Sequence, residues 1–236
     1  MRHSTLRPIL LLAFASACAR TDATRAATEK PAESTATAAG TIAPALPLKD
    51  TISERADRGR IMGDSTATLW VIMASDFQCP FCKQWHDQFF APVMQEYAAK
   101  NRIRLAFLNF PVAGHQNAVP AAEAAMCASV QRKFWPMHES LFATQTRWEK
   151  MSNPTPLFDS LATAAGVDMS LYRTCRTKHL TLPLIEADRD RGRAAGVGST
   201  PTFFVGSEAL LGADKDLRGP IEAALAKGRG AKKPAN

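Results

Sequence analysis

The pattern of apolar and polar positions predicts two strands in the first half of the chain. Residues 68–75 form a short apolar run that ends at Asp76. Because this run is apolar on both of its faces, it predicts a buried central strand. A second apolar run, residues 103–110, predicts another strand.

Between these two runs, apolar and bulky residues recur at helical spacing, with Pro80 suited to the first helical position. The recurring residues are Cys82, His86, Phe89, Val93 and Tyr97. Pro92 lies inside this pattern and predicts a kink, because proline cannot donate the backbone hydrogen bond that its position requires.

The second half of the chain carries helical patterns until its last forty residues. Helices are expected over residues 118–132, 134–143, 156–165, 169–178 and 182–197, separated by Gly, Pro and Asn. Residues 201–205 and 208–211 then predict a strand pair, and residues 216–227 a closing helix. The sequence therefore predicts an α/β fold, with a helical block inserted at about residues 117–197.

The first 17 residues have the order of a secretory signal peptide: basic residues, an apolar stretch, then small residues ahead of Cys18. The apolar stretch is too short to span a membrane. Small residues directly before a cysteine also resemble a lipoprotein lipobox, although Ala15 stands where leucine is usual. Both interpretations place cleavage after Ala17, and they differ in whether Cys18 carries lipid.

Residues 18–55 are rich in Ala, Thr, Pro and Glu and contain no aromatic residue, so we expect a flexible tether. A tether after an N-terminal cysteine suits an exported domain held at a membrane by lipid, which favours lipidation of Cys18 over plain secretion. The folded domain is expected over residues 56–228, and a basic flexible tail over residues 229–236. The expected location is the periplasm or cell envelope.

The composition argues against a disordered chain, a membrane-spanning protein and a nucleic-acid-binding protein. With 46% hydrophobic and 22% charged residues the chain can bury a core, and no apolar run approaches the roughly 18 residues of a membrane span. The net charge is 29 − 22 = +7. Several of the basic residues lie at the chain ends and the rest are scattered, so no nucleic-acid partner is expected.

The chain has five cysteines, an odd number for an exported protein. Lipidation of Cys18 would remove one from the thiol pool. Cys79 and Cys82 form a C-x-x-C pair, and Cys127 and Cys175 are left as a second pair. We expect Cys127 and Cys175 to form a structural disulfide within the helical block; the alternative is two buried free thiols.

The C-x-x-C pair predicts redox chemistry. At a helix start, backbone N–H groups and the helix dipole stabilise the Cys79 thiolate, while Cys82, one turn further on, resolves the mixed disulfide. A structural bridge would constrain little chain entropy. A zinc site would have only three ligands, with His86 as the third, so neither a metal nor a cofactor is expected.

Several motifs follow one another in the order and spacing of a known family from about residue 60 to 227. They are residues 75–82 (SDFQCPFC), Phe110–Pro111 with His115, Phe134–Trp135 with His138 and Leu141–Phe142, and residues 198–204 (GSTPTFF). The chain resembles the DsbA-like thiol:disulfide oxidoreductases. The resemblance implies a thioredoxin-like mixed sheet with an inserted helical subdomain.

The resemblance also implies a cis peptide bond before Pro201, which turns Thr200 toward the cysteine pair. The backbone N–H and C=O of Thr200 would then pair with an extended substrate. The alternative is an ordinary turn proline with a trans bond. One departure concerns Met73, which stands where many members carry an acid that assists proton movement at the buried thiol.

Other conspicuous residues receive simpler interpretations. Phe81, with Pro80, is expected to face outward as a contact for substrate or partner. His86 is interpreted as a helix-surface residue, and His115 and His138 as structural. Packing is expected for Trp70, Trp85, Phe134 and Trp135.

Three functions remain open at this point. The first is an exported oxidase that introduces disulfides into unfolded or partly folded exported proteins with thiols, recycled by a membrane redox partner. The second is a reductase or isomerase, and the third is a peptide-binding chaperone without essential redox chemistry. Isomerases of this family generally carry an N-terminal dimerisation domain, which residues 19–55 look unable to form, so a monomeric oxidase is favoured.

Overall fold

The computed structural model describes residues 51–231, with side chains to residue 228. These residues belong to one of the two units into which the chain divides, Leu46–Asn236. The expected signal peptide, the lipidation site Cys18 and nearly all of the expected tether lie outside the described residues.

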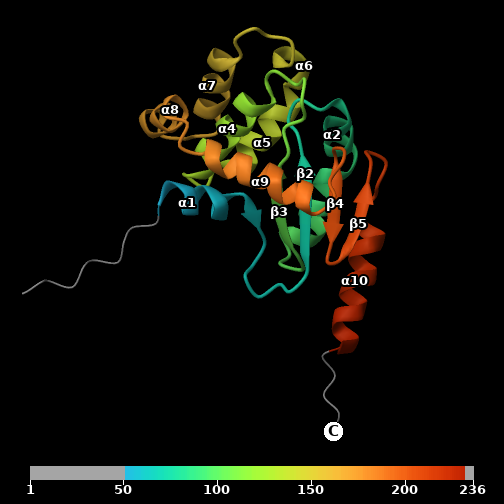
Figure 1. The fold of residues 1–236 in the computed structure, drawn as a ribbon. Helices are drawn as coiled ribbons and strands as arrows, with labels where there is room; N and C mark the ends of the chain where they lie inside the picture. The colour runs from blue at the N-terminus through green and yellow to red at the C-terminus, as the bar shows by residue number, and fades with distance from the viewer. Residues whose placement is uncertain (1–50, 232–236) are drawn as a thin grey trace, which may run out of the picture. The chain divides into compact units, whose positions relative to one another are not determined.

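The described residues contain a five-stranded mixed sheet with the strand order β1-β3-β2-β4-β5 (Figure 1). The strands are β1 (Ile61–Met62), β2 (Trp70–Ser75), β3 (Arg104–Asn109), β4 (Thr202–Val205) and β5 (Glu208–Leu211). Strands β2 and β3 are parallel, and the other neighbouring pairs are antiparallel. The two strands expected near residues 70 and 105 are therefore sheet neighbours, and β4 joins the other side of β2.

Helices make up the rest of the described chain. They are α1 (Ile52–Gly59), α2 (Pro80–Trp85), α3 (Ala91–Val93), α4 (Ala118–Ser129), α5 (Phe134–Ala143), α6 (Gln145–Trp148), α7 (Thr155–Ala164), α8 (Met169–Thr177), α9 (Leu182–Ala194) and α10 (Arg218–Ala231). Two π-helical turns, η1 (His86–Phe90) and η2 (Met94–Ala98), alternate with α2 and α3 in one continuous run. The first π turn ends just before Pro92 of α3, which cannot donate to the carbonyl of residue 88.

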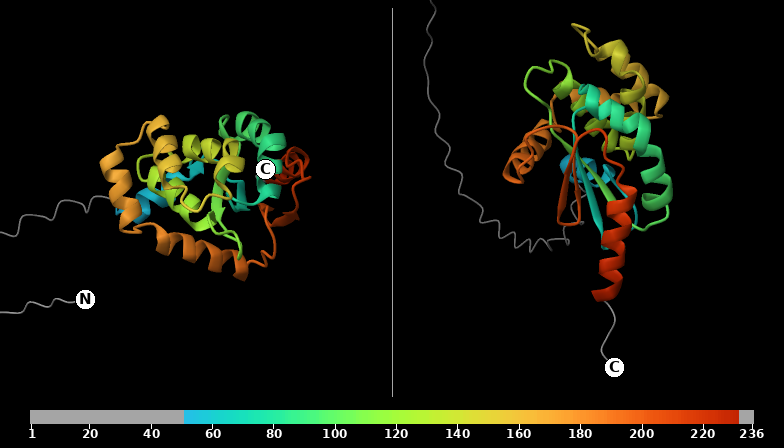
Figure 2. Two further views of the ribbon diagram at one scale, coloured as in Figure 1. Left: turned by 90° about the horizontal axis from the view of Figure 1, so that it is seen from above. Right: turned by 90° about the vertical axis from the view of Figure 1, so that its right-hand side faces the viewer.

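Helices cover both faces of the sheet (Figure 2). On one face lies α9, where Phe110 and Leu108 contact the position at which Gly192 lacks a side chain; a Cβ there would be 2.7 Å from the Phe110 ring. On the other face lie the α2 run and α10, and the Trp85 ring packs against Phe203 of β4 at 4.5 Å between centroids. The α2 run is thus held directly against the central strands.

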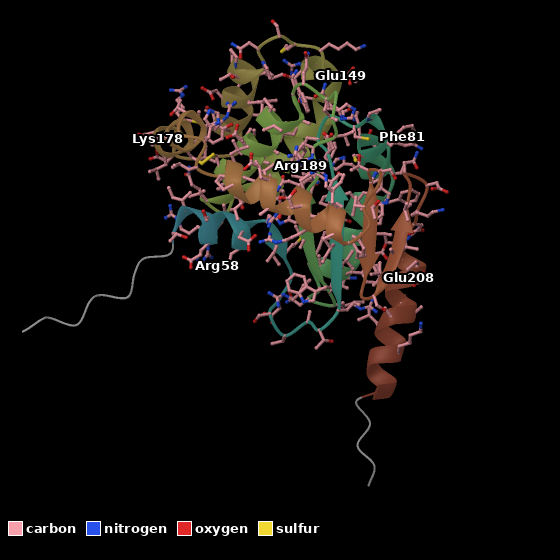
Figure 3. All side chains as sticks on the ribbon, viewed as in Figure 1. Arg58, Phe81, Glu149, Lys178, Arg189 and Glu208 are labelled. Atoms are coloured by element: carbon pink, nitrogen blue, oxygen red, sulfur yellow. A yellow bond between two sulfur atoms is a disulfide. The ribbon has the colours of Figure 1, made fainter. Side chains whose placement is uncertain are left out.

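Helices α4 to α8 form the inserted block. The structure joins Cys127 of α4 to Cys175 of α8 in a disulfide with a Cα–Cα distance of 5.8 Å. Figure 3 shows the bond in yellow near the end of the block marked by Lys178. Helix α9, which the sequence analysis grouped with the insertion, instead packs on β3 and belongs to the sheet layers.

The boundaries differ from the expected ones for local reasons. The folded part begins at α1, before residue 56, because Thr51 and Glu54 form a reciprocal capping box that starts the helix. At the other end α10 continues to Ala231, inside the expected tail. The short elements β1 and α6 carry too few residues for a periodic pattern, and the sequence analysis missed both.

A buried ion pair connects α9 with the start of the sheet. The Arg60 guanidinium contacts both carboxylate oxygens of Asp188 and donates to the Phe107 carbonyl at 3.1 Å. The same carboxylate accepts from the backbone N–H of Asn109 at 3.1 Å and from its side-chain amide at 2.9 Å. Asp188 is fully buried, so its charge depends on these donors.

We predict that Asp188→Asn lowers the free energy of unfolding by about 3 kcal/mol, because the buried Arg60 guanidinium loses its buried counter-ion and keeps the half-exposed carboxylate of Asp57. Urea denaturation of wild type and variant measures the change. Glu186→Gln is the control on the same helix: Glu186 is exposed, and its loss should change stability by less than about 0.5 kcal/mol. Equal stabilities of the two variants would contradict the prediction.

Candidate active site

The end of β2 and the start of α2 bring the two free cysteines together. Cys79 is the N-cap residue of α2, with Pro80 at the first helical position, and Cys82 lies one turn further in. Both side chains are buried, with 5% of Cys79 and 2% of Cys82 exposed. The backbone N–H of Asp76 donates to the Cys82 Sγ at 3.5 Å.

The pKa of Cys79 is lowered and the pKa of Cys82 is raised relative to an ordinary thiol. The pKa of Cys79 is lowered from 9.0 to about 6, mainly because the Cys82 thiol donates a hydrogen bond to its thiolate. Burial opposes this shift, while Thr200 and the backbone N–H groups of Phe81 and Cys82 support it. The sequence argument assigned the effect to the helix start alone, but the partner thiol contributes most.

Burial raises the pKa of Cys82 well above its ordinary value, and the neighbouring Cys79 thiolate raises it further. Above about pH 6 the reduced pair therefore holds one proton, and this proton is bound to the Cys82 sulfur. This arrangement leaves a nucleophilic sulfur at Cys79 and a protonated sulfur behind it.

The residues before β4 face Cys79. The peptide bond between Thr200 and Pro201 is cis, and the Cys79 Sγ lies 3.6 Å from the Thr200 carbonyl oxygen. Thr200 is almost buried, with 8% exposed. In the reduced protein the Thr200 carbonyl, expected to be free for substrate, is thus already in contact with the Cys79 sulfur.

A cleft of about 400 Å³ opens beside Cys79. Three of the expected binding residues, Pro80, Phe81 and Thr200, line this cleft. His115 and two of the three arginines of α9, Arg189 and Arg193, also line it. Pro201 lies next to this lining rather than in it. Figure 3 labels Phe81 on α2 and Arg189 on α9.

Phe81 projects from the active-site helix with 61% of its surface exposed. Phe81 therefore has no part in core packing, and its ring lies at the cleft beside Cys79.

Two amide side chains that the sequence analysis did not single out support the loop before Cys79. Gln145 of α6 donates to the carbonyls of Phe77 at 2.7 Å and Cys79 at 3.0 Å. Gln78 donates to the Glu149 carbonyl and accepts from the backbone N–H of Asn117, both at 2.7 Å. The only sequence signal was the place of Gln78 inside the family motif; the contact from Gln145 spans 66 residues.

Asp76 also supports this loop. Its buried carboxylate accepts from the backbone N–H of Gln78 at 2.7 Å and of Val112 at 2.9 Å, and lies 2.6 Å from the His115 Nδ1. Asp76 therefore joins the loop before Cys79 to the loop after β3. Met73, where the family often has an acid, is buried in the core, so no carboxylate approaches Cys82 from that position.

The other aromatic residues and the histidine that the sequence analysis named mostly pack in the interior. Trp85 and Phe134 are buried, and Trp135 packs against the core from a partly buried position. Trp70 lies beneath the Arg104 guanidinium at 4.0 Å. The surface interpretation of His86 is wrong: only 10% of its side chain is exposed, because it stacks on Phe90 and Phe142.

A family model described as thioredoxin matches residues 55–222. The chain belongs to the thioredoxin family. Membership agrees with the expected enzyme class, a DsbA-like thiol:disulfide oxidoreductase, and with the motifs that carry the resemblance.

Solved structures confirm the thioredoxin-like fold. The oxidised BdbD of Bacillus subtilis superposes with a TM-score of 0.64 at 22% identity, covering 72% of this chain and 94% of that one. The alpha-DsbA1 of Wolbachia pipientis gives a TM-score of 0.62 at 18% identity, covering 74% and 94%.

Curated relatives are of two kinds. The disulfide bond formation protein D of Bacillus subtilis is 24% identical over 152 residues, covering 64% of this chain and 68% of that protein. The Na(+)/H(+) antiporter NhaA 3 of Salinispora tropica is 30% identical over 151 residues, covering 63% of this chain. The chain spans only 22% of that antiporter's length.

We predict that alkylation of the reduced protein follows a single ionisation with a midpoint near pH 6, because the thiolate of Cys79 is the reacting species. In Cys82→Ala the midpoint should rise toward 9.0, since the hydrogen bond that contributes most is removed. A wild-type midpoint near 9.0 would contradict the assignment.

The same ionisation affects stability with a defined sign. A thiol whose pKa is lowered on folding contributes stability that is complete above its unfolded pKa and is lost as pH falls through its folded pKa. The reduced form should therefore gain stability relative to the oxidised form as pH rises from about 6 to 9.0, measurable by urea denaturation of both forms.

Proposed function

We propose that this chain is an exported thiol:disulfide oxidoreductase that works mainly as an oxidase through Cys79 and Cys82. The observation that carries the proposal is the lowered pKa of Cys79 beside a protonated, buried Cys82. A stabilised thiolate makes Cys79 a good leaving group and favours the reduced state of the pair, so the oxidised pair accepts electrons readily.

In the proposed reaction a substrate thiolate attacks the Cys79 sulfur of the oxidised pair. A substrate–Cys79 disulfide forms, the Cys79–Cys82 bond breaks, and Cys82 leaves as a thiolate that takes up a proton. A second substrate thiolate then attacks the substrate sulfur and releases Cys79 as a thiolate. The substrate gains a disulfide, and its two electrons remain on the cysteine pair.

We assign substrate contacts to Thr200, whose carbonyl oxygen lies 3.6 Å from the Cys79 Sγ, to its neighbour Pro201, and to Pro80 and Phe81 on the helix. An extended peptide beside Thr200 would pair with its backbone, taking the place of the Cys79 sulfur at the Thr200 carbonyl. The Phe81 ring then offers apolar contact to unfolded chains. The substrates proposed are unfolded or partly folded exported proteins with thiols, and a membrane redox partner would reoxidise the pair.

Two alternatives use the same surface. A reductase would run the same exchange with electrons leaving the pair, and a peptide-binding chaperone would use the Phe81 surface without redox chemistry. We place the oxidase first because the acidity of Cys79 favours electron acceptance, and propose that the protein acts as a monomer.

We predict that Cys82→Ser accumulates mixed disulfides with thiol-containing exported proteins, because Cys79 then lacks its resolving partner. Cys79→Ser should accumulate none and serves as the matched control. Non-reducing electrophoresis of the tagged protein from cell-envelope extracts measures the adducts. The reverse pattern would overturn the roles of the two cysteines, and no adduct in either variant would favour the chaperone.

The direction of electron flow is decided by equilibrating the wild-type pair with glutathione. An oxidase should give a reduction potential above that of glutathione, and the oxidised protein should form disulfides in a reduced, unfolded substrate. A potential well below that of glutathione would favour the reductase.

The proposed location depends on the N-terminal residues. Among residues 51–231, the structure contains no helix with the length and apolar character needed to cross a membrane. We propose that the chain is cleaved after residue 17 and anchored by lipid on Cys18.

We predict that Cys18→Ser moves the protein from the membrane fraction to the soluble fraction, since the lipid is the proposed attachment. Detergent partitioning of envelope preparations measures the change. Unchanged partitioning of Cys18→Ser would contradict the anchor, while leaving the redox activity of Cys79 untouched.

A further inference from the structure

His138 is a buried polar side chain without a partner. It is completely buried in α5, and neither of its ring nitrogens has a hydrogen-bond partner among the described residues. Aromatic rings surround it, with ring centroids at 4.7 Å for Phe90, 5.0 Å for Phe142 and 5.2 Å for Trp135. A buried polar group that makes no hydrogen bond destabilises the fold, so its presence calls for a ligand.

Two further donor groups lie beside His138. The His86 ring is 5.2 Å from the His138 ring, and the His86 Nε2 lies 3.2 Å from the Glu139 Oε2. One donor atom from each of the three side chains lies within 4.8 Å of the other two. The cluster joins η1, which follows the active-site helix, to α5 of the inserted block.

We propose that His86, His138 and Glu139 bind one divalent transition-metal cation of the zinc class. Two imidazole nitrogens and one carboxylate oxygen suit Zn²⁺ and its neighbours, whereas Mg²⁺ and Ca²⁺ prefer oxygen ligands. Two ligands about 2.1 Å from a tetrahedral ion are about 3.4 Å apart, close to the separation of the His86 and Glu139 atoms.

The surroundings of the cluster fit a metal site. The His86 Nδ1 lies 3.3 Å from the Asp87 carboxylate, which is itself held by Lys83 at 2.8 Å. A carboxylate on the second nitrogen of a histidine ligand fixes the orientation of its ring. About half of the Glu139 side chain is exposed, which gives the ion a route from solvent and leaves a fourth position for water.

A simple ion pair does not explain the cluster as well. Pairing of His86 with Glu139 and Asp87 would account for the two surface contacts. It would leave the nitrogens of His138 without any partner, whereas a metal ion gives one of them a bond. Bound metal would also connect the helix that carries Cys82 to the inserted helices, because the backbone N–H of His86 donates to the Cys82 carbonyl.

The test is a titration of the full chain with Zn²⁺ alone, followed by calorimetry. Cys18, Cys79 and Cys82 are replaced by serine in every sample, so that no free thiol competes for the ion. We expect one Zn²⁺ per chain and a rise in melting temperature on binding. Cobalt substituted for zinc should give the visible absorption of a site with imidazole ligands.

Two variants separate the proposed site from adventitious binding. Glu139→Gln, on the surface, should weaken Zn²⁺ binding about tenfold or more, and His138→Phe, which suits the aromatic surroundings, should abolish the cobalt spectrum. Glu186→Gln, an exposed acid on α9, is the matched control and should bind like the parent.

Absence of Zn²⁺ binding in the parent would overturn the proposal. Binding unchanged by both Glu139→Gln and His138→Phe would also overturn it, because the ion would then occupy another site. Either result leaves the proposed redox function standing, since that function depends on Cys79 and Cys82 alone.

Discussion

The hydrogen bond between the Cys79 thiolate and the Cys82 thiol is the interaction on which the site depends. It lowers the pKa of Cys79 and raises the pKa of Cys82. It requires Cys82 to remain buried and protonated. The sheet, the helix start and the Thr200 segment all serve that requirement. Strand β2 delivers the loop before Cys79, and β4 brings Thr200 against the reactive sulfur.

The supporting contacts come mainly from the inserted helices. Gln145 holds the carbonyls on either side of Gln78, and Asn117 meets the same loop from the start of α4. The aromatic cluster around Phe77 continues this connection, with Phe107 of β3 at 4.8 Å and Phe142 of α5 at 5.1 Å. The insertion is therefore part of the active-site support as well as an addition to the sheet.

Local sequence patterns predicted most helices and strands, but they could not predict contacts between residues that are far apart in the sequence. Helix α5 and strand β5 have the predicted bounds, because continuous periodicity and turn residues mark them. The C-x-x-C pair and the proline of the Thr200 segment were recognised from short motifs. Gln145 and Asp188 carry no local signal, since each acts on residues far away in sequence, and His86 was misplaced because its neighbours come from α5.

The distance in sequence between Cys79 and Thr200 has a consequence for the growing chain. The two residues are 121 positions apart, and the Arg60–Asp188 pair spans 128. Because a chain is synthesised from its N-terminus, Cys79 is made well before the residues of β4 and α9. In that interval Cys79 lacks the Thr200 contact that helps to lower its pKa, although Cys82, the main cause of the shift, is already part of the chain. The side of the cleft that Thr200 forms is therefore completed only when the C-terminal strands join the sheet, so the acidity of the thiol and the shape of the cleft beside it arise at different stages of folding.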